Sequence, residues 1–195
     1  MNITLLRLYP KTLILIFILM LAIAVEQTSL RDSVYYQLYD VFQWLKHSSW
    51  IGMLGTTFGS IYATVEAVHL LSMALLGGTV LVTDLRLLGI LLKNTPSELI
   101  CIETYPYFKV SLLLAIITGI FCAAGVADKL YDMRVFWMKM LSLILASCFA
   151  FFIKQPLLTS QPHTQISPWL LKLLALSSLT IWFTVAAAGR WIGFS

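Results

Sequence analysis

Long apolar runs alternate with short polar stretches along most of the chain. A helix needs about 20 apolar residues to cross a bilayer. Five runs reach or approach this length, at residues 12–25, 58–82, 107–127, 135–153 and 169–188. Short connections between helices favour antiparallel neighbours. The pattern predicts an all-α fold, a polytopic membrane helix bundle of five transmembrane helices, with a four-helix core and an additional N-terminal span.

The first run follows basic residues and ends near Ala22-Ile23-Ala24, a pattern that a retained signal anchor shares with a cleaved signal peptide. We expect a signal anchor, with removal of residues 1–24 as the alternative. Residues 27–60 are rich in Tyr and Trp, which prefer the headgroup level and predict a helix lying on the membrane. We therefore divide the chain into residues 1–40, the N-terminal span and linker, and residues 41–195, a four-helix membrane domain with an interfacial helix before its first span.

Polar residues at the ends of the runs predict where helices begin and end. The second span is expected to continue as a helix to about Leu92. Thr95-Pro96-Ser97-Glu98 predicts a short amphipathic helix, and Pro106 is expected to open the third span. Residues 155–167 are predicted to form a loop. Ser167 and Pro168 then provide an N-cap and a first helical position for the last span.

Composition supports a membrane protein. Of 195 residues, 59% are hydrophobic and 11% are charged, and the mean hydropathy is +0.88. The net charge of +4 comes from basic residues spread singly between the spans, which fits the positive-inside pattern and not a nucleic-acid-binding face. Seven Lys and Arg against five place the N-terminus in the cytoplasm. We expect the lipid bilayer as the partner and no nucleic acid.

Ionisable residues within the spans are the best functional clue, because a charged group near the bilayer centre costs at least ~2.5–3.5 kcal/mol. Glu66 and His69 are three apart and share a face of the second span. We expect them to be buried against later spans and Asp84 to lie at a solvated interface. The predicted intramembrane polar network comprises Glu66, His69, Asp84, Arg86, Lys139 and Arg190.

Several short motifs resemble an uncharacterised bacterial family of integral inner-membrane proteins, known only as a domain of unknown function. The most specific are Glu66-x-x-His69, Asp84-Leu85-Arg86-Leu87-Leu88-Gly89 and the closing Gly189-Arg190-Trp191. The resemblance implies a four-helix core in a bacterial inner membrane and supplies no activity. Members often place a histidine where this chain has Ile153-Lys154, which argues against ligation by two histidines.

Cofactor chemistry has little support in the sequence. The Glu66-x-x-His69 pair is half of a di-iron helix motif, but the chain has no second pair. Zinc needs three or four clustered ligands, and none of the three cysteines forms a CxxC pair. We expect no catalytic residues, no metal and no resident cofactor. The alternative is haem b, with His69 as an axial ligand.

Three functions remain open from the sequence. The first is a non-enzymatic accessory or anchoring subunit of a membrane complex, bound to other subunits. The second is a haem b electron-transfer protein that uses His69. The third is a small transporter or a proton or ion pathway that uses Glu66 and His69.

Overall fold

The computed structural model describes residues 30–47, 50–160 and 162–194. Within these ranges, four helices are long and apolar enough to cross a membrane, which shows a multi-pass bundle. They are α4 (Gly59–Leu87), α5 (Ser97–Gly125), the helix Arg134–Thr159 that begins with α7 (Arg134–Cys148), and α9 (Pro168–Ile192). The predicted N-terminal span at residues 12–25 lies outside the described residues.

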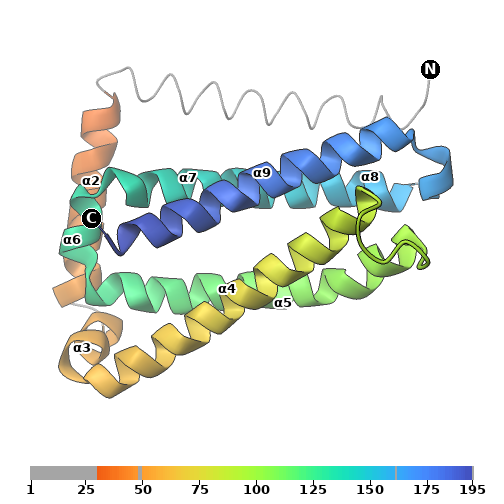
Figure 1. The fold of residues 1–195 in the computed structure, drawn as a ribbon. Helices are drawn as coiled ribbons and strands as arrows, with labels where there is room; N and C mark the ends of the chain where they lie inside the picture. Colours follow the sequence, from red (N-terminus) through yellow and green to blue (C-terminus); the bar gives the residue numbers. More distant parts are fainter. Residues whose placement is uncertain (1–29, 48–49, 161, 195) are drawn as a thin grey trace.

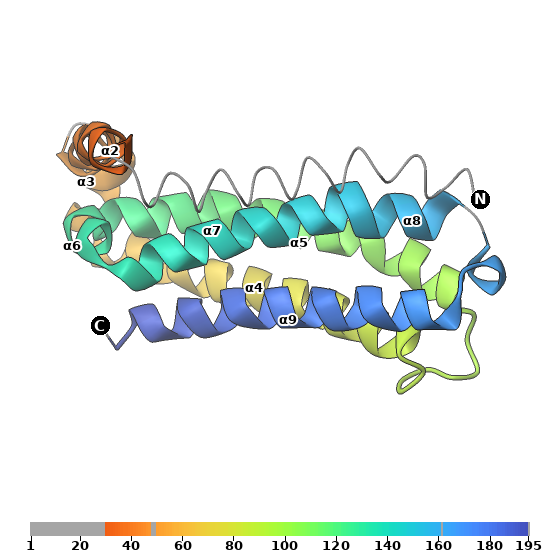
Figure 2. The ribbon, with the colours of Figure 1, turned by 90° about the horizontal axis from the view of Figure 1, so that it is seen from above.

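The four long helices run antiparallel in chain order, as short connections require (Figure 1). Helix α4 packs along α5 and α9, and α7 packs along α9. The view from above shows the same elongated bundle (Figure 2). The connection between α8 (Gln155–Ser160) and α9 lies at one end, and α2 (Leu30–His47), α3 (Trp50–Thr57) and α6 (Ala127–Asp132) lie at the other.

Helix α2 stands across one end of the bundle instead of running along it (Figure 1). Its inner side contacts α6 through Tyr39 and Phe42, whose rings lie 5.2 and 5.6 Å from the ring of Tyr131. Lys46 forms an ion pair with Asp128 of α6. The elements at this end are α2 (Leu30–His47), α3 (Trp50–Thr57) and α6 (Ala127–Asp132). A helix perpendicular to the spans fits the interfacial position that the aromatic residues predict.

Two helix boundaries differ from the prediction. Pro106 lies inside α5, which is continuous from Ser97, because a transmembrane helix tolerates the loss of one backbone hydrogen bond when neighbouring groups compensate. Helix α4 ends at Leu87 and does not reach Leu92. It is closed by Gly89, whose φ of +76° is the left-handed conformation that commonly ends a helix.

The predicted loop at residues 155–167 begins as helix. Helix α7 passes into a wider π-helical segment, η1 (Phe149–Lys154), and then into α8 (Gln155–Ser160). Pro156 lacks the N–H that would bond to the carbonyl of Phe152, so regular α-helical bonding cannot continue through this point. The final helix begins at Pro168, as Ser167-Pro168 predicts.

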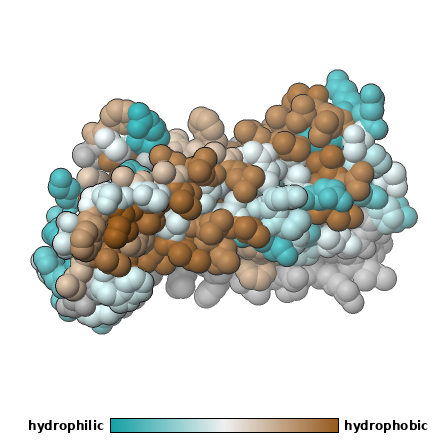
Figure 3. Space-filling model, turned by 90° about the horizontal axis from the view of Figure 1, so that it is seen from below, coloured by the Kyte–Doolittle hydropathy of each residue, from teal (hydrophilic) through white to brown (hydrophobic). Residues whose placement is uncertain are grey.

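Large apolar side chains remain exposed along all four long helices, as expected where lipid replaces water. Hydrophobic residues extend over much of the body in Figure 3, and hydrophilic residues lie mainly towards the ends. Among the most exposed are Leu71, Leu113, Ile144 and Phe183. The bundle interior is correspondingly narrow.

Candidate functional site: two polar clusters separated by an apolar layer

A buried ion pair joins three helices near the α8 end of the bundle. Lys154 Nζ donates to Asp84 Oδ1 at 2.5 Å and to Ser178 Oγ at 3.2 Å. Asp84 is 0% exposed and Lys154 is 9% exposed. The expected solvated position of Asp84 is therefore wrong, because this carboxylate lies inside the bundle with a cation from another helix.

The π-helical segment ends at Lys154, the residue that reaches Asp84. A π-helical turn contains an extra residue, so it rotates the side chains that follow relative to a regular helix. Both Ile153 and Lys154 are buried. Pro156 gives a local reason for the segment, and such segments are frequent at functional sites.

A small cavity lies beside the ion pair. Its volume is about 40 Å³, and Lys154, Thr83 and Thr104 contribute polar atoms to its wall. The hydroxyls of Thr83 and Thr104 lie 2.9 Å apart and connect α4 to α5. Asp84, Lys154, Ser178, Thr83 and Thr104 are called the Asp84 cluster below.

His69 belongs to a second group of polar residues, nearer the α3 end. Its Nδ1 lies 2.9 Å from Thr118 Oγ1, and that hydroxyl lies 2.6 Å from the carbonyl of Leu114. A hydroxyl has one proton, so when Thr118 donates to Leu114 it accepts from Nδ1–H. The imidazole lies against Gly119, where a Cβ would be only 3.1 Å from Cε1. The ring is thus held by α5.

Lys139 is the other charged member of this second group. It is half-buried on α7 and lies within electrostatic reach of His69. Its side chain covers Gly189 of α9, where a Cβ would be 3.4 Å from Cε. His69, Thr118, Gly119, Lys139 and Gly189 are called the His69 cluster below.

The remaining predicted network residues lie outside both clusters. Glu66 is exposed on α4, although it lies within electrostatic reach of His69 and of Cys122 on α5. Arg190 is exposed, and its guanidinium lies 4.4 Å from the ring centroid of Phe194. Arg86 Nε donates to the carbonyl of Thr95 at 2.7 Å and holds the loop after α4. The structure therefore does not gather the six predicted residues into one network.

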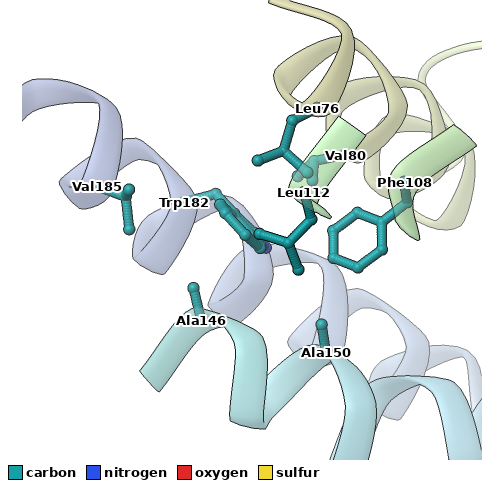
Figure 4. Packing of buried hydrophobic residues seen from close by; sticks show 8 residues of the cluster. All are labelled: Leu76, Val80, Phe108, Leu112, Ala146, Ala150, Trp182 and Val185. Atoms are coloured by element: carbon teal, nitrogen blue, oxygen red, sulfur yellow. The ribbon is translucent and has the colours of Figure 1, made fainter. Parts of the chain in front are cut away.

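An apolar layer separates the two clusters. On α4, Leu76 and Val80 lie between His69 and Asp84. His69 and Asp84 are about 22 Å apart along the helix axis. The other helices repeat this order, and Figure 4 shows the whole layer, which consists of Leu76, Val80, Phe108, Leu112, Ala146, Ala150, Trp182 and Val185. The ring centroids of Phe108 and Trp182 lie 5.7 Å apart at 86° and fill its centre. Thr79 and Ser111 are buried at the same level, but their hydroxyls donate to carbonyls of their own helices, so no described polar contact joins the two clusters through this layer.

Sequence reasoning missed the main partners in both clusters. Lys154 directly follows the fourth predicted span, residues 135–153, and the predicted topology places it on the same membrane side as Asp84. This shared membrane side is the sequence feature that could have indicated a pair between Asp84 and Lys154. His163 was also missed. Its Nδ1 lies 2.8 Å from Ser97 Oγ, and its backbone N–H donates to Glu98 Oε1 at 2.6 Å.

The described residues contain no group of three or more His, Cys, Asp or Glu side chains placed to hold a metal ion. The observed arrangement instead joins helices through polar pairs. His69 connects α4 to α5, and Lys154 connects the end of the third long helix to α4 and α9.

Four long apolar helices with polar pairs between them define a multi-pass helical membrane protein. The chain belongs to a family of unknown function (DUF6644), whose model matches residues 41–195. This result confirms the resemblance to an uncharacterised family. Comparisons with curated proteins and with solved structures found no match.

Proposed function

We propose that this protein is a non-enzymatic accessory or anchoring subunit of a complex in a bacterial inner membrane. The observation that carries the proposal is the apolar layer between the Asp84 and His69 clusters. Polar side chains of a conduction path would be expected to continue across the bundle. Here they bond between helices on each side of a packed layer, which favours a rigid scaffold.

The end formed by α2 and α3 is the surface that best suits contact with another subunit. Phe42 and Lys46 fix α2 to the bundle, while Tyr36, Trp44 and Trp50 remain exposed. Trp and Tyr are enriched at protein interfaces and at the headgroup level, where one end of the side chain is apolar and the other is wet. The positive-inside count would place this end outside the cytoplasm.

Purification of the full-length protein in a mild detergent tests the proposal. We expect a larger membrane complex to co-purify with it. Replacing Trp44 and Trp50 with Gln should release the complex, and the matched change of lipid-facing Leu71 and Phe183 to Ala should retain it. A clean monomer without associated proteins would contradict an accessory role.

Flux measurements in proteoliposomes separate this proposal from transport. An accessory or anchoring subunit is expected to give no specific proton or ion flux above that of protein-free vesicles. Flux that disappears in Glu66→Gln or His69→Ala would instead support a proton or ion pathway through the predicted residues.

A further inference from the structure

The Asp84–Lys154 pair has hydrogen-bonding capacity that the described protein groups do not satisfy. Asp84 Oδ2 is buried and has no hydrogen-bond partner in the described part of the chain. Lys154 has three ammonium protons, and its two described acceptors are Asp84 Oδ1 and Ser178 Oγ. Buried polar groups of this kind are commonly completed by internal water.

The adjoining cavity has Lys154, but not Asp84, in its wall, and it can supply water to the ammonium group. Its volume of about 40 Å³ exceeds the 10–15 Å³ that a water molecule requires on this measure. Each hydroxyl has one proton, so when Thr83 donates to the carbonyl of Thr79 at 2.7 Å, Thr104 donates to Thr83 at 2.9 Å. Their oxygens therefore retain lone pairs that can accept from water, as Lys154 can donate to it.

A second, larger pocket opens at the α8 end of the bundle. It has a volume of about 400 Å³, and Glu98, Thr159 and His163 contribute polar groups to its wall. The pocket and the small cavity share three wall residues, which are Cys101, Gln155 and Leu158. Only this layer of side chains lies between the pocket and the cavity beside Lys154.

The apolar layer forms one wall of the cavity. Val80, Phe108 and Trp182 belong both to the cavity wall and to the apolar layer. This layer separates the cavity from the His69 cluster.

We propose that the pocket and cavity form a water inlet that delivers protons to the Asp84–Lys154 pair. In the binding step, Lys154, which borders the cavity, transfers a proton to Asp84 Oδ1, and hydronium returns a proton to the Lys154 amine and leaves as water. Asp84 becomes a neutral carboxyl group, and Lys154 keeps its three protons. The site gains one positive charge without a continuous path across the membrane.

The groups that face the pair would tune this proton binding. Lys154 of η1 is the direct counter-charge, α9 contributes the neutral Ser178, and α5 contributes Cys101. Arg86 and Glu98 also lie within electrostatic reach of this region. The apolar layer separates this site from the His69 cluster, so proton binding here requires no transport across the membrane. Proton binding is therefore independent of the proposed accessory role.

Infrared difference spectroscopy of the full-length protein in lipid tests the inlet. As the pH falls, the C=O stretch of a protonated carboxyl group should appear, and transfer to D₂O should lower its frequency. The band should disappear in Asp84→Asn, move in Asp84→Glu, and persist in Glu66→Gln and Glu98→Gln.

Thr83→Val/Thr104→Val keeps the shape of the cavity wall but removes its two hydroxyls. This double variant should retain the Asp84 band and slow its response to D₂O, whereas Thr180→Val should exchange as the wild type does. The proposal is overturned if the folded wild type shows no Asp84-dependent band. It is also overturned if the double variant exchanges as fast as the wild type.

Discussion

The imidazole of His69 lies in the space that a side chain at position 119 would occupy. An ideal Cβ built on Gly119 would be 3.1 Å from His69 Cε1 and 3.6 Å from Nδ1. The closest approach of α4 to α5 at this level therefore depends on a glycine facing a histidine.

Gly119→Ala should destabilise the bundle by about 1–3 kcal/mol, the usual range for overpacking a tight contact. Gly77→Ala is the matched control, because a Cβ there meets nothing within 4 Å. It should be neutral or stabilise by about 0.5–1 kcal/mol, as Gly to Ala does within a helix. Unfolding in mixed detergent micelles measures both. Equal effects of the two substitutions would show that His69 does not occupy this space.

Thr118→Val should remove the hydrogen bond to His69 while preserving the shape of the side chain. Hydrogen bonds between transmembrane helices contribute about 0.6 kcal/mol on average and up to about 1.7 kcal/mol. Thr180→Val provides the control, since the exposed Thr180 hydroxyl donates to the carbonyl of Leu176 in its own helix. A nitrogen NMR shift of His69 in Thr118→Val, absent in Thr180→Val, would report the lost contact directly. Identical histidine spectra would exclude it.

Phe42 should control the attachment of α2 to the bundle. Its ring centroid lies 5.6 to 5.8 Å from those of Tyr131, Trp137 and Phe136. Phe42→Ala removes these aromatic contacts, each contributing about 0.5–1.5 kcal/mol beyond area burial. We expect faster amide exchange across α2, unchanged exchange in α9, and little effect from Val41→Ala, which alters an exposed neighbour. Exchange of α2 that is unaltered by Phe42→Ala would contradict this docking.

An absorbance spectrum tests the expectation that no haem is bound. Protein purified from haem-replete cells should show no Soret band before or after reduction with dithionite. His69 is already bonded to Thr118 and packed against Gly119, which gives the residue a role without iron. A Soret band that is lost in His69→Ala would identify a haem protein and overturn this expectation.

The transmembrane helices of the core could be predicted from the sequence because apolar runs of sufficient length have few alternatives in a membrane. Ser167-Pro168 also located the start of α9 correctly. Pro106 did not mark the start of the third span. The energetic penalty of an internal proline depends on compensation by neighbouring helices, which a local motif does not reveal.

The partners within the candidate site were harder to predict. His69 and Asp84 could be recognised as unusual residues within a span, but their partners Thr118 and Lys154 lie 49 and 70 positions away. Hydrophobic periodicity is also weak in helices that are apolar on all sides, so it does not define which face is buried. Glu66 illustrates this limit, since it shares an approximate face with His69 and is nevertheless exposed.

We infer that polar pairs buried between the spans hold the bundle together, with Asp84–Lys154 the principal pair. A double-mutant cycle of Asp84→Leu and Lys154→Met in the full-length protein measures the interaction between these two residues. Each single change leaves one buried charge unpaired and should cost about 3–5 kcal/mol, whereas the double variant should cost far less than their sum. Glu66→Gln combined with Lys154→Met should be additive. Additive effects at Asp84 and Lys154 would contradict the claim.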